Sequence, residues 1–182
     1  LISDSLPSSP DTAKADSNIP TTNMADYGRI EYKSPGVWVL CHGGNLPLNA
    51  VPGDDGKESE ISYVGRALQS GDVIPGRVVP SSKCCYVGHS YKEFEHKDYQ
   101  LLVTEPSTLV WLPSSNGAVP SGAIQGGAGY KGEPLYIARA PVNGKKTIGK
   151  VHPSLNAAFI PYGGTEHRFT EYEVLVCKTN NF

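Results

Sequence analysis

Residues 37 to 103 of this 182-residue chain repeat as residues 110 to 176, at a fixed offset of 73 and without a gap. Twenty of the 67 aligned columns are identical, and many of these hold glycine, proline or an aromatic residue. Compositional bias does not produce such an alignment, so the chain contains a tandem duplication. A functional site built on one copy is therefore expected to exist twice.

The size of the copies predicts how they are organised. Each copy is close to the length at which a single hydrophobic core becomes marginal, and the linker at residues 104–109 is too short for independent domains. We expect one compact unit in which repeat 1 (37–103) and repeat 2 (110–176) share a core across a pseudo-twofold axis. Residues 1–36 are expected to form an extended leader, and residues 1–23, which are rich in serine and proline, a linker or a processed segment.

Short apolar runs separated by glycine and proline predict an all-β fold with short antiparallel strands, because no stretch keeps a 3.6-residue apolar period for three turns. Pro75–Gly76 and Ile148–Gly149 are expected to form tight turns in which glycine supplies a positive φ. The expected strands are 37–40, 61–67, 77–79, 84–87 and 99–103 in the first copy, and 109–112, 134–140, 150–152, 157–161 and 172–177 in the second.

Composition excludes several classes of function. The net charge of −2, with both signs interspersed, gives no basic face and argues against a nucleic-acid partner. The apolar stretches are too short to span a membrane. None of the four cysteines is retained between the copies, which argues against a cysteine-dependent core and leaves the location open between extracellular and cytoplasmic.

Catalytic signatures are absent from the sequence. There is no Gly-x-Ser-x-Gly elbow and no His-Glu-x-x-His pair, and none of the five histidines is matched by a histidine in the other copy. We therefore expect no catalytic residues, no metal site and no cofactor, and hence a protein that is not an enzyme.

Charged positions kept in both copies are candidates for either bracing or ligand binding, and both interpretations stay open. Another column holds a cation in both copies, Arg77 and Lys150. A cation beside acidic loops suits vicinal hydroxyls, since a carboxylate accepts hydrogen bonds and an ammonium or guanidinium donates them. The retained charges are Glu60/Glu133, Arg66/Arg139 and Glu93/Glu166.

Four motifs occur in order in the second copy and more loosely in the first: Gly132–Ala140, Gly149–Ser154, Pro161–His167 and Tyr172–Val176. Through them, residues 37–176 closely resemble the DM-nine repeat family. That resemblance implies a β-rich pair of repeats, as in mannose-binding bivalve lectins and in the amino-terminal part of natterin-like proteins.

In sugar-binding members of that family, a loop aspartate and the lysine of a Pro-Gly-Lys-Val turn hold the mannose hydroxyls. The lysine column falls on Arg77 and Lys150 here, and the aspartate column falls on Gly56 and Gly129. Neighbouring acidic residues are the candidates to replace the aspartate, and Tyr130 offers a surface on which a pyranose could stack. The ligand-binding candidates are therefore Asp54, Asp55, Glu60, Arg77, Tyr130, Glu133 and Lys150.

The resemblance and the duplicated polar loops predict a calcium-independent, carbohydrate-binding lectin or pattern-recognition protein of innate immunity. Mannose-type sugars are the first expected ligands, and glycans or glycoconjugates are the expected partners. Pairing of sites within the chain, in a homodimer or in a higher assembly would add avidity. The alternative is a structural or adhesion subunit that has kept the fold and lost the sugar site.

Overall fold

Thirteen β-strands make up the described part of the chain, which covers residues 36–54, 60–105 and 108–178 of a computed structural model. These residues belong to one compact unit. The expected leader lies outside the described residues except for Gly36. The described residues include no α-helix, and η2 (Pro153–Leu155) is a short 3-10 helix.

The strands follow one another in the same order in the two repeats, except that repeat 2 has β8 as an additional strand. Those of repeat 1 are β1 (Val37–His42), β2 (Tyr63–Gln69), β3 (Asp72–Val79), β4 (Cys84–His89), β5 (Lys92–His96) and β6 (Asp98–Val103). Those of repeat 2 are β7 (Leu109–Ser115), β8 (Gln125–Ala128), β9 (Pro134–Val142), β10 (Lys145–His152), β11 (Ala157–Tyr162), β12 (Thr165–Phe169) and β13 (Glu171–Cys177).

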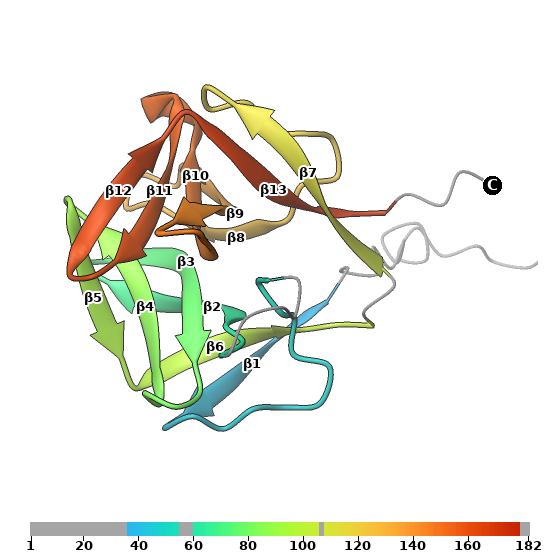
Figure 1. The fold of residues 1–182 in the computed structure, drawn as a ribbon, viewed down its shortest axis with the longest axis vertical. Coiled ribbons are helices and arrows are strands. Elements are labelled where there is room, and N and C mark those ends of the chain that lie inside the picture. The colour runs from blue at the N-terminus through green and yellow to red at the C-terminus, as the bar shows by residue number, and fades with distance from the viewer. Residues whose placement is uncertain (1–35, 55–59, 106–107, 179–182) are drawn as a thin grey trace, which may run out of the picture. The chain divides into compact units, whose positions relative to one another are not determined.

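The strand order shows the pseudo-twofold symmetry directly. Neighbouring strands run β1-β6-β2-β3-β4-β5-β12-β11-β10-β9-β13-β7, so the second half repeats the first half in reverse. The axis passes between β5 and β12, which pair through Thr165 and Lys92 and lie side by side between the two repeats (Figure 1). β8 lies off this path and pairs with β9 of its own repeat and with β3 of the other.

These observations confirm the predicted all-β class with antiparallel strands and pseudo-twofold symmetry. A strand lies at each of the ten expected positions, whereas β5, β8 and β12 were not expected. The first and last of these three are largely polar, and β8 reads Gln-Gly-Gly-Ala. None of them carries the apolar alternation by which a strand is recognised.

The prediction of tight turns at Pro75–Gly76 and Ile148–Gly149 was wrong. These residues lie inside β3 and β10, where Gly76 pairs with Gly65 and with Val87. A Cβ at Gly76 would overlap the carbonyl oxygen of Tyr86, and one at Gly149 would overlap that of Phe159. Glycine is needed in this column because the neighbouring strand approaches closely, and not because φ is positive.

A shared core joins the repeats. Each repeat has a cluster of buried apolar side chains of its own. A third cluster takes residues from both repeats, with Trp38 and Trp111 packed against it. Several members are pseudo-twofold partners, so the duplicated columns meet at the centre of the unit. The buried residues of this third cluster are Val51, Val64, Leu102, Ile124, Ile137, Ile148 and Leu175.

Two arginines cross between the repeats at the edge of this shared core. Arg139 donates from Nη1 to the carbonyl of Gly53 in repeat 1 at 2.9 Å, and Arg66 donates from Nη1 to the carbonyl of Gly126 in repeat 2 at 3.2 Å. Each guanidinium also lies over the tryptophan of its own repeat, 4.5 Å from the ring centroid of Trp111 for Arg139. The retained Arg66/Arg139 column therefore braces the fold.

The two arginines differ in their third partner. Nε of Arg66 donates to Gln100, whereas Nε of Arg139 donates to Glu173 at 2.6 Å, and Lys146 Nζ donates to the same oxygen at 2.7 Å. Burial opposes the charge of Glu173, but these two hydrogen bonds outweigh it and hold the pKa of Glu173 below its ordinary value. The partner of the arginine is thus a charged carboxylate in repeat 2 and a neutral amide in repeat 1.

The first prediction compares the two arginines. Arg139→Met should lower the free energy of unfolding by about 3–5 kcal/mol, because it removes one of the two cations bound to Glu173 and leaves the carbonyl of Gly53 without its guanidinium donor. The matched change Arg66→Met should cost less, about 1–3 kcal/mol, because its lost side-chain partner is neutral and Arg66 is less buried. Urea unfolding measures both values. Equal costs would contradict the assignment of the charged contact to repeat 2.

The second prediction concerns acid. Glu173→Gln places the residue of repeat 1 in repeat 2 and should cost about 1 kcal/mol at pH 7. Because the pKa of Glu173 is depressed in the folded protein, its contribution is present above the unfolded pKa and disappears as the pH falls through the folded value. The difference in stability between wild type and variant should therefore shrink below about pH 4. A difference that is independent of pH would refute this.

Candidate functional site

Two polar pockets contain the cations of the Arg77/Lys150 column, and both are built from residues of the two repeats. The Lys150 pocket has a volume of about 350 Å³ and the Arg77 pocket about 140 Å³. Five repeat columns line both pockets, so the pockets are pseudo-twofold equivalents. These columns are Ser62/Leu135, Asp72/Lys145, Arg77/Lys150, Val79/His152 and His89/Tyr162.

Lys150 is fixed in its pocket by two oxygen atoms. Its Nζ donates to the carbonyl of Gly88 at 2.7 Å and lies 3.0 Å from Glu166 Oε1. The ammonium is almost fully buried, with its side chain 8% exposed. A buried charge of this kind is tolerated because its partners are fixed in place, and it presents an oriented donor next to an oriented carboxylate.

Arg77 is held in an equivalent way in the smaller pocket. Its Nη2 lies 2.8 Å from Glu93 Oε2 in a salt bridge with little solvent exposure. The guanidinium also lies over two rings, 4.5 Å from the centroid of Tyr86 and 5.2 Å from that of Tyr162. Aromatic faces attract a guanidinium electrostatically, so the rings and the carboxylate together fix its position.

The glutamates of these pairs tie each cation to the hairpin of the other repeat. Glu166 Oε2 accepts a hydrogen bond from the backbone N–H of Tyr91 at 3.1 Å. Its counterpart Glu93 accepts one through Oε1 from the N–H of Gly164 at 3.3 Å. Tyr91 and Gly164 occupy the same repeat column, so the contact is made twice. The Glu93/Glu166 column therefore braces the fold and shapes the pockets at the same time.

The Glu60/Glu133 column is bound to a serine in both repeats. Ser81 donates to Glu60, and Ser154 donates to Glu133 from its hydroxyl at 2.8 Å and from its backbone N–H at 2.9 Å. The backbone hydrogen bond from Ser154 is the main reason that the pKa of Glu133 lies below its usual range. Glu133 Oε1 also lies 3.2 Å from His152 Nδ1, which connects it to the Lys150 pocket.

The structure brings some of the sequence-predicted site residues together. Asp54, Glu60 and Arg77 line one pocket, and Lys150 lines the other. Glu133 reaches the Lys150 pocket only through His152. Tyr130 is 83% exposed and lines neither pocket, and Asp55 falls outside the described residues.

Several lining residues were missed by sequence reasoning. The signal that could have revealed them is a column that changes its chemistry between copies, as in Asp72/Lys145 and His89/Tyr162. In an alignment of the two copies such columns look like unconstrained substitutions. Only the fold shows that they line equivalent pockets. The additional lining residues include Asp72, His89, Tyr91, His152 and Arg168 at one pocket, and Lys145, Lys146 and Tyr162 at the other.

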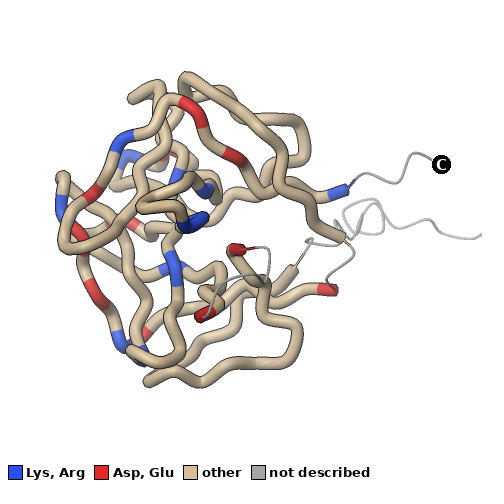
Figure 2. Tube along the Cα trace, in the orientation of Figure 1, with Lys and Arg blue, Asp and Glu red and all other residues tan. Residues whose placement is uncertain are grey.

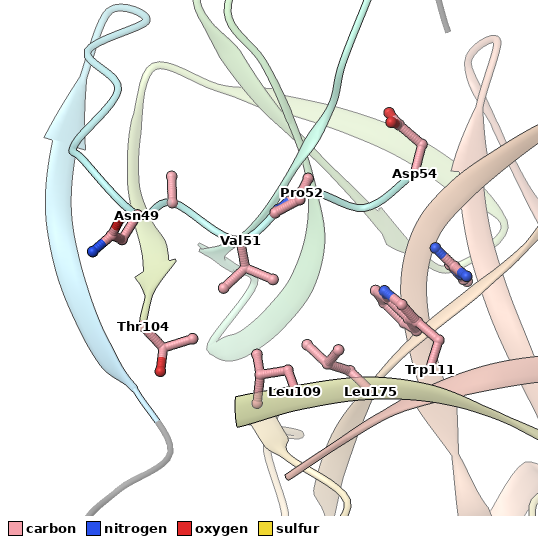
Figure 3. A pocket seen from close by; sticks show the side chains of 10 residues that line it. Asn49, Val51, Pro52, Asp54, Thr104, Leu109, Trp111 and Leu175 are labelled. Carbon is pink, nitrogen blue, oxygen red and sulfur yellow. The ribbon is translucent and has the colours of Figure 1, made fainter. Parts of the chain in front are cut away.

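A second pair of pockets is mainly apolar and lies beside the arginine contacts. One has a volume of about 200 Å³ and is lined by Trp111 and Leu175 of repeat 2 together with Val51 and Pro52 of repeat 1 (Figure 3). Its pseudo-equivalent is lined by Trp38 and the corresponding columns. These pockets flank the shared core and present less polar surface than the Lys150 pocket.

Along the described chain, lysine and arginine positions lie among aspartate and glutamate positions in both repeats (Figure 2). Within the same residues, no group of three or more histidine, cysteine, aspartate or glutamate side chains is placed to hold a metal ion. No helix in this part of the chain is long and apolar enough to cross a membrane.

The third prediction concerns Gly88, whose carbonyl accepts a hydrogen bond from Lys150 and beside which the side chain of Glu166 lies. A Cβ at this position would lie 2.5 Å from Glu166 Oε1, so Gly88→Ala must displace the carboxylate. We expect the free energy of unfolding to fall by about 1–3 kcal/mol. Gly129→Ala is the matched control, because the nearest atom to its Cβ lies at 3.9 Å, and it should change stability by less than about 0.5 kcal/mol. Denaturant titration gives the free energy of unfolding of both variants. A loss in Gly88→Ala alone indicates crowding of Glu166, whereas an equal loss in both would indicate a general effect of replacing glycine.

Comparison with known proteins agrees with this architecture. The chain is 27% identical to Natterin-4 of Thalassophryne nattereri over 170 residues, and 28% identical to Natterin-3 of the same species over 134 residues. These matches cover 91% and 72% of the chain but only 40% and 34% of the natterins, so the chain spans less than half the length of either relative.

The fold is similar to that in the crystal structure of the nematode sperm cell motility protein MFP2B, with a TM-score of 0.56. The match covers 81% of this chain and 48% of that one, at 18% identity, and therefore indicates a common fold only. The DM9 repeat model matches residues 54–169, which include the cation and the retained glutamates of both polar pockets. The chain belongs to the DM9 repeat family.

Proposed function

We propose that this chain is a calcium-independent carbohydrate-binding protein, and that its polar pockets hold the hydroxyl groups of mannose-type sugars. Membership in the DM9 repeat family fits a carbohydrate-binding, lectin-like role. The observation that carries the proposal is the Lys150–Glu166 pair, which lines a pocket of about 350 Å³ together with Asp72. Vicinal hydroxyls both donate and accept hydrogen bonds, so a fixed ammonium beside fixed carboxylates is complementary to them.

Calcium independence follows from the same chemistry. In this proposal the positive charge that orients the hydroxyls is supplied by Lys150 or Arg77, and no cation needs to be recruited. A single pocket of this size contacts one sugar ring, and the affinity of one such site is expected to be low. Useful binding to a glycan surface would then come from assembly of several chains, for which a homodimer is the simplest arrangement.

The second candidate is a structural or adhesion subunit without a sugar site. It is favoured by the bracing roles of Arg66, Arg139, Glu93 and Glu166, since a fold alone would retain all four. It is also favoured by Gly129, which stands where the family pattern has a sugar-binding aspartate. Under this alternative the wild-type chain binds no glycan, and Gly129→Asp is the change expected to create mannose binding on an intact scaffold.

The fourth prediction tests the two candidates. The wild-type protein on a glycan array should bind mannose-terminated glycans, with the same signal in EDTA as in calcium. Lys150→Met should weaken binding of methyl α-D-mannopyranoside by at least about tenfold in calorimetric titration, because a charge-assisted donor is lost. Lys131→Met is the matched control, since Lys131 is exposed and lines neither polar pocket.

Lys150→Met also leaves Glu166 without its cation, so circular dichroism must first show that the variant is folded. If Lys150→Met is not folded, Lys150→Arg is measured in its place, since arginine is the residue that repeat 1 has at this position. Absence of binding to any glycan at high protein concentration would refute the carbohydrate proposal. The structural or adhesion subunit would then be the remaining candidate function.

A further inference from the structure

Two edges of the described sheet are formed by the same strand of the two repeats. β1 and β7 occupy the same repeat columns and stand at the two ends of the strand order. Each of them pairs with one neighbour only among the described strands, β1 with β6 and β7 with β13. β1 lies along the outer border of repeat 1 (Figure 1). An edge strand offers a row of backbone donors and acceptors to another chain unless the edge is blocked.

The pairing of β6 shows which backbone groups of β1 point outward. In an antiparallel pair, successive residues alternate between facing the partner strand and facing away from it. The carbonyl of Leu102 accepts from the N–H of Val51 at 2.9 Å, on the side of β6 that is turned away from β1. Trp38 is the partner of Leu102, so Trp38 and Leu40 direct their N–H and C=O groups away from β6. Among the described residues, neither has a backbone hydrogen bond on that side.

The equivalent edge of repeat 2 is blocked by a proline. The carbonyl of Leu175 accepts from the N–H of Ile124 at 2.9 Å, as that of Leu102 does in repeat 1, so the alternation is the same in both repeats. Pro113 occupies in β7 the column that Leu40 occupies in β1. Proline has no N–H, and its ring points to where an added strand would lie. The edge of repeat 1 is therefore open at the position where that of repeat 2 is blocked.

The open edge is also apolar. Leu40 is 76% exposed and Val37 is 60% exposed. β1 reads Val-Trp-Val-Leu-Cys-His and contains no lysine, arginine, aspartate or glutamate. Charged side chains and proline are the usual means by which edge strands avoid pairing with another chain. The strand itself is held in place, because the guanidinium of Arg66 lies 4.1 Å from the ring centroid of Trp38. β1 is thus a fixed template without the protection that β7 has.

We propose that β1 is a dimer interface, at which the β1 strands of two copies of this chain pair antiparallel about a twofold axis at Val39. In this register the N–H of Trp38 donates to the carbonyl of the partner's Leu40, and the N–H of Leu40 donates to the carbonyl of the partner's Trp38. The symmetry repeats both hydrogen bonds. The resulting four bonds use all the outward backbone groups of these two residues in both copies.

A second copy is the occupant because β1 is complementary to itself. Leu40 lies opposite the partner's Trp38, so an exposed aliphatic side chain gains an aromatic neighbour, and no like charges within β1 face each other. A contact of this symmetric kind closes at two copies. Pairing of β1 with β7 of another copy would instead extend into a filament, and Pro113 opposes it. The inference concerns assembly and is independent of whether the polar pockets bind a sugar.

The test is sedimentation velocity of the full chain between about 1 and 200 µM, the range expected for an interface as small as one strand pair. The wild type should change from monomer to dimer across this range. Leu40→Pro gives β1 the residue that blocks β7, and should raise the dissociation constant by at least about tenfold. The variant should remain folded, because the N–H of Leu40 points away from β6 and β7 already contains Pro113 in the same column.

Two controls separate strand pairing from other effects. Leu40→Ala keeps the N–H and removes most of the exposed side chain, so it should weaken the dimer less than Leu40→Pro. Hydrogen exchange of the wild type needs no variant. The amides of Trp38 and Leu40 should exchange more slowly as the protein concentration rises, whereas the amide of Trp111, in the same column as Trp38 at the blocked edge, should not change.

The proposal holds if the wild type dimerises, Leu40→Pro dissociates the dimer, and protection from exchange rises at Trp38 and Leu40 alone of these three amides. A dimer that persists in Leu40→Pro would overturn it, as would an equal loss in Leu40→Ala or a parallel rise in protection at Trp111. A wild type that stays monomeric at the highest concentration would also overturn it, and would leave the open edge to an extended segment of a different protein.

Discussion

The structure depends on contacts that each repeat makes with the backbone of the other. Arg66 and Arg139 each donate to a glycine carbonyl across the repeat boundary, and Glu93 and Glu166 each accept from a backbone N–H across it. A repeat by itself would leave each of these charged groups without the backbone partner that the other repeat supplies, which is costly in a buried position. Each copy therefore completes the hydrogen bonding of the other.

The same contacts create the pockets. The glutamate that reaches across to the opposite hairpin also holds the cation of its own repeat, so the polar pockets form where the repeats meet. Bracing and pocket formation are combined in one residue in these columns, since Glu166 accepts a hydrogen bond from the opposite repeat and also lines the Lys150 pocket. The columns with the same residue in both repeats make the contacts between the repeats. The columns that differ, such as Asp72/Lys145 and Tyr91/Gly164, give the two pockets different side-chain chemistry.

The sequence was sufficient to predict the fold class, because the tandem repeat and the short apolar runs can both be recognised in a single sequence. The sequence did not reveal β5 and β12 because these strands are polar. It led to a wrong prediction at Gly76 because both a tight turn and a close approach between strands require glycine. For the site, the Arg77/Lys150 column was recognised from its charge. Asp72, Tyr91 and His152 were not, because they come from separate strands and turns and only long-range pairing brings them to one pocket.

The central claim is that a sugar binds between the repeats at the Lys150 pocket. The most direct test is a crystal structure of the full chain grown with methyl α-D-mannopyranoside. The account predicts a sugar whose hydroxyls are hydrogen-bonded to Lys150 and to the carboxylates of Glu166 and Asp72. A sugar bound elsewhere, including at the Trp111 pocket, or crystals that remain free of sugar at saturating concentration, would contradict it.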